Sequence, residues 1–298
     1  MYRICIVDDQ EAIRIMLQDF LEERYEVCTA PHADEALALC RKQPFDLVIS
    51  DINMPGKKGP ELLHDIKASY PGTKTVLITA YNIDDYIHLA KTYGISNIIP
   101  KTAPFNFTEL QSLIDALLSG RIFGLQRYLL DGGRVDETYQ VRSSKEARET
   151  RDVIIDRFVK KFGSAGEMKL ILDEIITNAL YHAPSLPDGS QKYEDYDEIT
   201  LAPDEYIDIA CGYDSEKYGV SVVDPKGNLQ RDTVLQKIER QVNGKGILDD
   251  SGRGIHMSRL FADRMVINIQ PAVKTEVILI NYFSNKFKGY KPLYINEL

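Results

Sequence analysis

The chain has 298 residues, a length that predicts about two domains. Its 45 acidic and 36 basic residues give a formal net charge of −9 without a marked Lys/Arg run, so neither nucleic acid nor an anionic membrane is expected as a main partner. No apolar run approaches the roughly 18 residues that a transmembrane helix needs, and the four cysteines form no C-x-x-C motif. These features predict a cytoplasmic protein with reduced thiols.

Residues 1–119 alternate short apolar runs with segments of helical periodicity. The predicted strands are YRICIV, YEVCTA, FDLVIS, TKTVLIT and SNII, and amphipathic segments lie near 10–23, 33–42, 58–69, 84–93 and 106–118. Strands that alternate with helices predict a doubly wound α/β domain with a five-stranded parallel sheet. In such sheets the functional groups gather at the carboxyl ends of the strands.

The predicted strand ends carry matching chemistry. Listed in chain order, they are Asp8 and Asp9 after the first strand, Asp51 after the third, Thr79 after the fourth and Lys101 after the fifth. Three converging carboxylates repel one another unless a hard cation such as Mg²⁺ lies between them. A lysine and a hydroxyl beside them suit the oxygens of a phosphoryl group carried on one aspartate. Each feature alone is compatible with an acidic turn, but the five together favour a phosphoryl site.

The segments IVDD, DLVISDINMPGKKG, VLITA and IIPK resemble the receiver domain of two-component response regulators, over essentially all of residues 1–119. The resemblance implies a flavodoxin-like fold and an upstream sensor histidine kinase as partner. It also implies these roles: Asp51 as phosphoacceptor, Asp8, Asp9, Asp51 and the Asn53 carbonyl around Mg²⁺, and Thr79 and Lys101 on the phosphoryl oxygens.

Two positions depart from the pattern of that family. Ile98 stands three residues before Lys101, where the family usually has an aromatic switch residue. The usual Lys-Pro dipeptide is stretched, so that Pro104 follows Lys101 by three positions. Tyr81, near the end of the fourth predicted strand, is an alternative candidate for the switch. Phosphorylation is therefore expected without the usual switch residue.

Residues 120–137 form a predicted connector, partly helical, with a Gly-Gly turn and apolar side chains that suit packing on either domain or a dimer seam. Residues 138–298 keep predicted helices and strands in separate runs, which favours an α+β sandwich. A capping box of Ser143 and Glu146 is expected to start its first helix. Two hairpins, EYIDIAC with YGVSVVD and VINIQP with TEVILINYF, are expected to follow.

Three polar features stand out in this second half. In LDEIITNALYHA, Glu174, Asn178 and His182 share one stripe of a predicted helix, a pattern that an ordinary polar seam also explains. Asp224 ends a strand, where a carboxylate suits an exocyclic amine of a base. Gly252 and Gly254 precede a helix, where backbone N–H groups approach phosphates.

The order E-x-x-x-N, D-x-x-G and G-x-G before a helix resembles the Bergerat-fold ATPases over about 138–284, most closely the anti-sigma-factor serine kinases. The resemblance implies ATP and Mg²⁺ as cofactors. The implied residues are Glu174 as general base, Asn178 on Mg²⁺, Asp224 on the adenine amine with Thr275 in support, Gly227 in the G1 box, and Gly252 and Gly254 in the G2 box.

This region also departs from its family. The G1 box carries one extra residue, and the segment 183–204 is longer and more polar than the family needs. Residues 229–251 are the expected lid over the phosphates, with Lys245 and Arg253 as candidate phosphate contacts or solvated side chains.

Together the motifs predict a response regulator whose phosphorylation at Asp51 controls an ATP-dependent serine/threonine kinase, with an anti-sigma antagonist as its target. No histidine lies on the helix 143–162, so autophosphorylation on histidine is not expected. One alternative is a binding module that sequesters a sigma factor or its antagonist without kinase activity, and another is an orphan ATPase half that phosphorylates a histidine on another protein. A homodimer is compatible with both halves.

Overall fold

The computed structural model describes residues 1–130, 132–244, 253–284, 287, 289 and 291–298. The chain divides into two compact units. Unit 1 comprises Met1–Arg121 with Pro292–Tyr294, and unit 2 comprises Ile122–Lys291 with Ile295–Leu298. Among the described residues, no helix is long and apolar enough to cross a membrane.

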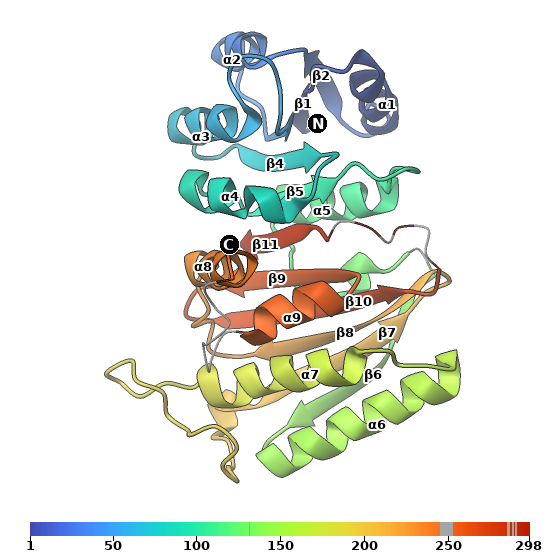
Figure 1. The fold of residues 1–298 in the computed structure, drawn as a ribbon, viewed down its shortest axis with the longest axis vertical. Coiled ribbons are helices and arrows are strands. Elements are labelled where there is room, and N and C mark those ends of the chain that lie inside the picture. The colour runs from blue at the N-terminus through green and yellow to red at the C-terminus, as the bar shows by residue number, and fades with distance from the viewer. Residues whose placement is uncertain (131, 245–252, 285–286, 288, 290) are drawn as a thin grey trace. The chain divides into compact units, whose positions relative to one another are not determined.

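Unit 1 is built on a parallel sheet in the order β2-β1-β3-β4-β5. Its strands are β1 (Arg3–Val7), β2 (Glu26–Ala30), β3 (Leu47–Asp51), β4 (Lys74–Thr79) and β5 (Asn97–Pro100). Its helices are α1 (Glu11–Leu21), α2 (Ala33–Lys42), α3 (Gly59–Ser69), the short η1 (Ile83–Tyr86), α4 (Ile87–Tyr93) and α5 (Phe107–Ser119). Helices α1 and α5 cover one face of the sheet and α2, α3 and α4 cover the other (Figure 1). The predicted doubly wound α/β fold is confirmed.

Burial explains why the strands of unit 1 are so apolar. Every residue of β3 is buried, and so are four of the five residues of β1. A parallel sheet with helices on both faces needs apolar side chains in both directions along each strand. The polar groups at the strand ends are therefore the exception, and they lie at the same edge of the sheet.

The edge of this sheet at β5 carries a segment that the sequence analysis did not anticipate. Strand β11 (Leu293–Glu297) pairs antiparallel with β5, and Leu293 lies opposite Ile98 and Tyr294 opposite Asn97. The Tyr294 hydroxyl donates to Glu109 Oε1 at 2.7 Å. Unit 1 is thus completed by residues close to the other end of the chain.

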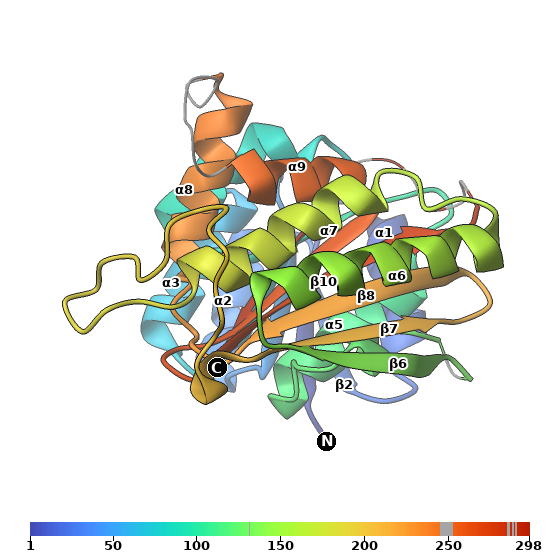
Figure 2. The ribbon, with the colours of Figure 1, turned by 90° about the horizontal axis from the view of Figure 1, so that it is seen from below.

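Unit 2 contains an antiparallel sheet in the order β9-β10-β8-β7-β6. The strands are β6 (Arg134–Val141), β7 (Ile207–Tyr213), β8 (Lys217–Asp224), β9 (Arg264–Gln270) and β10 (Lys274–Tyr282). The helices are α6 (Ser144–Phe162), α7 (Met168–Thr177), α8 (Arg231–Val242) and α9 (Arg253–Phe261). Figure 2 shows α6, α7 and α9 above one face of these strands, which is an α+β arrangement. Both predicted hairpins, β7 with β8 and β9 with β10, are present.

The predicted connector belongs to unit 2 from Ile122 onward. Strand β6 begins at Arg134, four residues before the predicted strand TYQV, and therefore takes up the end of the connector. Upstream lies η2 (Leu125–Tyr128). Gly124, directly before it, is attached to β10 because its N–H donates to the Glu276 carboxylate at 2.9 Å. Glu276 is only 2% exposed, so this bond satisfies part of a buried charge.

Helix α6 begins with a modified form of the predicted capping box. The Ser143 hydroxyl accepts from Glu146 N at 3.2 Å, as expected for an N-cap. The Glu146 carboxylate, however, accepts from Arg142 N at 2.8 Å and does not return to Ser143. The α-helix α7 likewise ends earlier than the sequence pattern indicates. It ends at Thr177 and continues as a π-helical turn, η3 (Asn178–His182), in which Ala183 N donates to the Asn178 carbonyl.

The start of α3 gives a prediction on stability. A Cβ atom at Gly59 would lie 1.9 Å from the Asp51 carbonyl oxygen, which is backbone and cannot rotate away. We expect Gly59→Ala to lower the free energy of unfolding by about 2–3 kcal/mol, measured by urea denaturation. Gly72→Ala is the matched control because nothing lies within 4 Å of its added Cβ, and it should change stability by less than about 0.5 kcal/mol. Equal effects of the two substitutions would contradict the prediction.

Candidate functional site

The strand ends of unit 1 bring three charged side chains into contact. Lys101, directly after β5, places its Nζ 2.7 Å from Asp8 Oδ2 and 2.6 Å from Asp51 Oδ1. Asp8 follows β1 and Asp51 ends β3, the two neighbouring strands at the centre of the sheet. The predicted acidic cluster is therefore organised around one shared ammonium group.

Burial makes this contact electrostatically strong. Asp8 is 0% and Asp51 is 6% exposed. Burial raises the pKa of Asp8 above its ordinary value, although Lys101 acts in the opposite direction. Burial works to lower the pKa of Lys101, but its hydrogen bonds to Asp51 and Asp8 outweigh burial and raise that pKa. Lys101 therefore remains a cation between two carboxylates.

The other predicted residues of this site surround the cluster at different distances. Asn53 N donates to Asp51 Oδ2 at 2.7 Å, which fixes the plane of that carboxylate. Thr79 is 1% exposed and its hydroxyl accepts from Tyr81 N at 3.0 Å. Asp9 is exposed and has no ion pair with Lys101 among the described residues.

The donor set is compatible with a hard cation. The described parts of the chain contain no group of three or more His, Cys, Asp or Glu side chains arranged to hold a metal. Two carboxylates with a nearby backbone carbonyl are nevertheless the oxygen ligands that Mg²⁺ takes, and Mg²⁺ usually keeps several of its waters. Asp8, Asp51 and the Asn53 carbonyl fit this set, and Asp9 is the exposed carboxylate next to Asp8.

Tyr86 is a residue that the sequence analysis missed. Its hydroxyl accepts a hydrogen bond from Asn53 Nδ2 at 2.5 Å. Tyr81, the alternative candidate for the switch, is 57% exposed, and its ring centroid lies 6.5 Å from that of Tyr86. An aromatic residue in a predicted amphipathic helix is usually part of the core, so sequence alone carried no signal for this contact. Ile98 is fully buried.

Unit 2 contains a cavity of about 220 Å³ where its predicted motifs meet. The cavity is lined by Ile175, Asn178, Ala179, His182, Ala183, Val222, Asp224, Asn228, Leu229, Thr233, Lys237, Ile255, Thr275 and Val277. Residues from α7 and η3, the end of β8, α8, α9 and β10 therefore share one space. Apolar walls with a few convergent polar groups are typical of small-molecule sites.

Asp224 lies at the sheet end of this cavity. Its Oδ1 accepts from Lys226 N at 3.0 Å and from Gly227 N at 3.1 Å, which leaves Oδ2 for other donors. Burial raises the pKa of Asp224 against the lowering effect of these N–H groups. Thr275 lies opposite Asp224 in the register of β10 and β8 and is 2% exposed. Among the described residues its hydroxyl finds no hydrogen bond of standard geometry.

Gly227 is needed where it stands despite the extra residue in the loop. Its φ of +62° suits glycine, and an added Cβ would lie 2.4 Å from the Gln270 carbonyl oxygen and 2.7 Å from Val273 N. The Asp224–Gly227 loop therefore packs directly against the turn between β9 and β10.

Glu174 lies beside the second glycine motif rather than in the cavity wall. A Cβ at Gly254 would lie 2.4 Å from Glu174 Oε2, so the carboxylate packs against the bare backbone of α9. Burial, followed by the charge of Asp173, raises the pKa of Glu174. Gly252 and Lys245 lie outside the described residues, and so does the side chain of Arg253.

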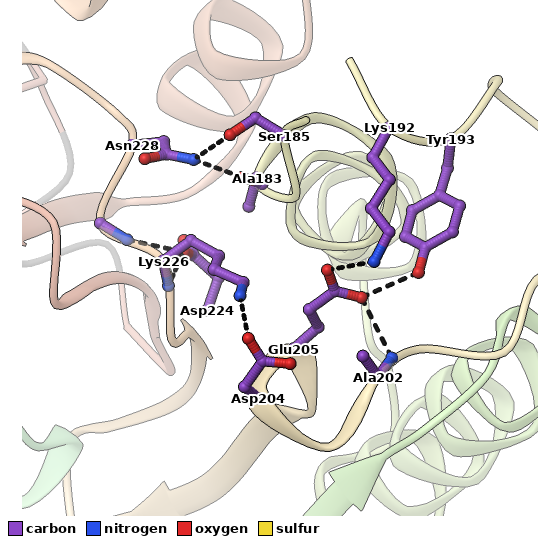
Figure 3. A network of polar contacts seen from close by, with 11 residues as sticks. Ala183, Ser185, Lys192, Tyr193, Ala202, Asp204, Glu205, Asp224, Lys226 and Asn228 are labelled. Atoms are coloured by element: carbon purple, nitrogen blue, oxygen red, sulfur yellow. Dashed lines mark hydrogen bonds and ion pairs between the residues drawn. The ribbon is translucent and has the colours of Figure 1, made fainter. Parts of the chain in front are cut away.

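The polar segment 183–204 is attached to the Asp224 loop (Figure 3). Asn228 Nδ2 donates to the Ala183 carbonyl at 2.7 Å and to Ser185 Oγ at 3.1 Å. Lys226, in the lengthened G1 box, forms an ion pair through Nζ with Asp204 at 2.6 Å. The segment is therefore an ordered border of the cavity.

Buried Glu205 and exposed His182 also contact the same segment. Glu205 is 4% exposed and accepts from Lys192 Nζ at 2.6 Å and from the Tyr193 hydroxyl at 2.8 Å (Figure 3). His182 lies 3.3 Å from Gln191 Oε1 through Nδ1 and 3.5 Å from Asp195 Oδ2 through Nε2. Both ring nitrogens of His182 therefore contact polar side chains of this segment.

Lys237 is a second residue that the sequence analysis missed. It is the one Lys or Arg among the described residues that line the cavity, and no acidic side chain in the described chain pairs with it. Burial lowers its pKa. Thr233 lies one turn earlier on α8 and lines the same cavity. An uncompensated, half-buried cation favours an anionic ligand.

The comparisons with known proteins concern unit 1. The response regulator receiver domain family matches residues 4–115. The sporulation initiation phosphotransferase F of Bacillus subtilis is 33% identical over 117 residues, which cover 39% of this chain and 93% of that protein. The chain belongs to the response regulator receiver family.

Other relatives match the same part of the chain. A response regulator receiver protein of Anaeromyxobacter is 37% identical over 102 residues. The match covers 34% of this chain and 43% of that relative. The solved structure of the response regulator TrrA of Thermotoga maritima, in complex with Mg(2+)-BeF, is 38% identical and covers 40% of this chain and 100% of its own, with a TM-score of 0.36. Residues 4–115 form a two-component receiver domain.

The shared ammonium group gives a prediction on pH dependence. Lys101→Met leaves two buried carboxylates uncompensated, and we expect it to lower the free energy of unfolding by about 3–5 kcal/mol at pH 7. A carboxyl whose folded pKa is raised, as for Asp8, binds protons more readily in the folded state. The stability difference between Lys101→Met and the wild type should therefore shrink as the pH falls through that raised pKa.

Lys57→Met is the matched control for Lys101→Met. Lys57 pairs with Asp65 at the surface, with exposed side-chain fractions of 34% and 44%, so its loss should cost less than about 1 kcal/mol at any pH. Thermal or urea unfolding between pH 5 and pH 8 measures both variants. A Lys101→Met deficit that is constant with pH would contradict the electrostatic explanation.

Proposed function

We propose that this chain is a response regulator that accepts a phosphoryl group on Asp51 with the help of Mg²⁺, and that this modification controls an ATP-dependent serine/threonine protein kinase in unit 2. An upstream sensor histidine kinase would supply the phosphoryl group. An anti-sigma antagonist is the proposed target of the kinase. The observation that carries the kinase half is the cavity shared by Asn178, Asp224 and Thr275.

Phosphoryl acceptance rests on the arrangement around Asp51. Asn53 N and Lys101 Nζ each hold one oxygen of its carboxylate, so the acceptor is fixed before a donor arrives. Asp8, Asp51 and the Asn53 carbonyl would hold the metal, which would neutralise phosphoryl charge when bound. Lys101 and the Thr79 hydroxyl would contact the remaining phosphoryl oxygens.

Nucleotide binding in unit 2 is supported by the polar groups at the end of β8. The Lys226 and Gly227 N–H groups both bind Oδ1 of Asp224, and Thr275 lies opposite Asp224 in the register of β10 and β8, so the pair would offer an acceptor and a hydroxyl donor to an adenine edge. Asn178 would hold Mg²⁺ against the phosphates, and Lys237 would offset phosphate charge from the opposite wall.

Kinase chemistry would require a base near the phosphates. Glu174 has a raised pKa and packs against Gly254, the second residue of α9 and the last glycine of the predicted G2 box. Glu174 would take the proton of a target Ser or Thr hydroxyl as that oxygen attacks phosphorus. A side chain at position 254 would clash with this carboxylate, so the position requires glycine.

A second candidate function is a binding module for a sigma factor or its antagonist, with nucleotide as a structural ligand only or not at all. The observation that favours it is the fastening of the Asp224 loop to the segment 183–204 through Asn228 and Lys226. This fastening makes one side of the cavity rigid and presents a polar, largely exposed border to partners.

The nucleotide proposal predicts a specific effect of Asp224→Asn. The wild-type chain should bind ATP in a calorimetric titration, and Asp224→Asn should bind it about 10- to 100-fold more weakly, because a charged acceptor of the base amine is lost. Because burial raises the pKa of Asp224, the wild-type affinity should fall on acidification at a higher pH than an ordinary aspartate would allow.

The control for Asp224→Asn is Asp232→Asn on the exposed side of α8, which should leave ATP affinity unchanged. A pH step that survives in Asp224→Asn would exclude this residue as its origin. If the wild-type chain binds no ATP at millimolar concentration, the nucleotide proposal fails and the binding module remains.

The kinase proposal predicts label transfer. With labelled ATP, Mg²⁺ and a candidate anti-sigma antagonist, acid-stable label should appear on Ser or Thr of the antagonist. Glu174→Gln should slow this transfer about 10²- to 10⁴-fold, since a general base contributes in that range. Glu167→Gln, an exposed glutamate next to the same helix, should transfer label normally.

Acetyl phosphate tests the link between the two halves of the proposal. It should change the transfer rate of the wild-type chain and leave that of Asp51→Ala unchanged. Antagonist binding without any label transfer would instead favour the binding module. Acid-labile label on the partner would point to histidine as the acceptor.

A further inference from the structure

The loop that follows Asp51 is held from two directions. The Asn53 backbone N–H donates to Asp51 Oδ2 at 2.7 Å, and the Asn53 side-chain amide donates to the Tyr86 hydroxyl at 2.5 Å. Asn53 and Tyr86 are half-buried, so the contact is partly shielded from competing water. Asn53 therefore connects the phosphoacceptor with η1.

We propose that Tyr86 is a positioning residue for phosphoryl transfer to Asp51 and that it acts through Asn53. The inference rests on the proposed acceptor role of Asp51. Asn53 contributes two backbone groups to the site, an N–H that orients the carboxylate and a carbonyl that fits the cation. Tyr86 holds the side chain of the residue that carries both groups.

The structure leaves Tyr86 as the single anchor of the Asn53 amide. Among the residues that the structure describes, no other side chain hydrogen-bonds that amide. Tyr81 is 57% exposed and only its ring approaches Tyr86, at 6.5 Å between centroids. Ile98, at the position where the family usually has an aromatic switch residue, is fully buried and has no polar group to offer.

The effect on chemistry follows from the geometry of attack. An Asp51 oxygen forms a bond to phosphorus while the bond between phosphorus and the donor oxygen breaks. With acetyl phosphate as donor, acetate leaves with the bonding electron pair and no proton has to move. If Asn53 rotates freely, the carboxylate spends less time in the attacking orientation, and the maximal rate falls while donor binding is unchanged.

The placement of Tyr86 also links the site to the start of α4. Tyr86 is the last residue of η1, and Ile87 begins α4 directly after it. The Asn82 side chain caps the start of η1 by accepting from Asp84 N at 3.2 Å. A change in Asn53 on phosphorylation therefore reaches a helix terminus through one hydrogen bond.

The test is phosphorylation of the full chain by acetyl phosphate with saturating Mg²⁺, followed by intact mass. Tyr86→Phe keeps the ring and removes the hydroxyl, and its maximal rate should fall about 3- to 10-fold with the same half-saturating acetyl phosphate. Its thermal unfolding midpoint should match that of the wild type. Tyr81→Phe is the matched control and should react at the wild-type rate.

A double-mutant cycle separates positioning from general damage. Asn53→Ala should slow the reaction to a similar degree, and Tyr86→Phe combined with Asn53→Ala should be no slower than Asn53→Ala alone. A wild-type rate in Tyr86→Phe, or additive losses in the double variant, would overturn the role of Tyr86 only. A wild-type chain no more reactive than Asp51→Asn would overturn the acceptor role of Asp51 and this inference with it.

Discussion

The receiver site depends on one ammonium group between two carboxylates that water hardly reaches. Lys101 lies within hydrogen-bond distance of both Asp8 and Asp51. Parallel strands bring their carboxyl ends to one edge, so the fold itself forces these charges together, and the lysine makes the arrangement tolerable. Any charge added to Asp51 must therefore be met by Lys101 or by a cation at the same place. Two carboxylates share this single ammonium group, so the cluster keeps a net negative charge.

Unit 2 stabilises a buried aspartate by a different route. The loop after Asp224 folds back and offers two backbone N–H groups to one carboxylate oxygen. Backbone donors carry no net charge, so the second oxygen keeps its ability to accept from a ligand. The contrast with Asp51 lies in the partner: Asp51 is paired with a cation, whereas Asp224 is held by neutral backbone amides.

Sequence reasoning succeeded where a local rule implies a tertiary position. Alternating strands and helices predicted the fold of residues 4–115, and the position of each charged residue at a strand end was enough to bring Asp8, Asp51 and Lys101 together. It did not find Tyr86 and Lys237. Both depend on which face of a helix meets the site, and helical periodicity alone does not specify the neighbour.

The segment 183–204 and the π-helical turn at Asn178 were also beyond reach of pattern reasoning. Polar composition indicated a loop, but the contacts of Asn228 and Glu205 that order it connect positions far apart in the sequence. The residue types of the π-turn are those of an ordinary helix. Only its i to i+5 hydrogen bond distinguishes it.

Strand β11 has a practical consequence for anyone who divides this chain. Leu293 and Tyr294 satisfy the outer hydrogen-bonding groups of β5, and the Tyr294 hydroxyl fastens them to α5. A fragment cut after Arg121 would present Asn97–Pro100 as a bare strand, open to annealing with a second molecule. Self-association of such a fragment would then be an artefact of truncation and not a property of the intact protein.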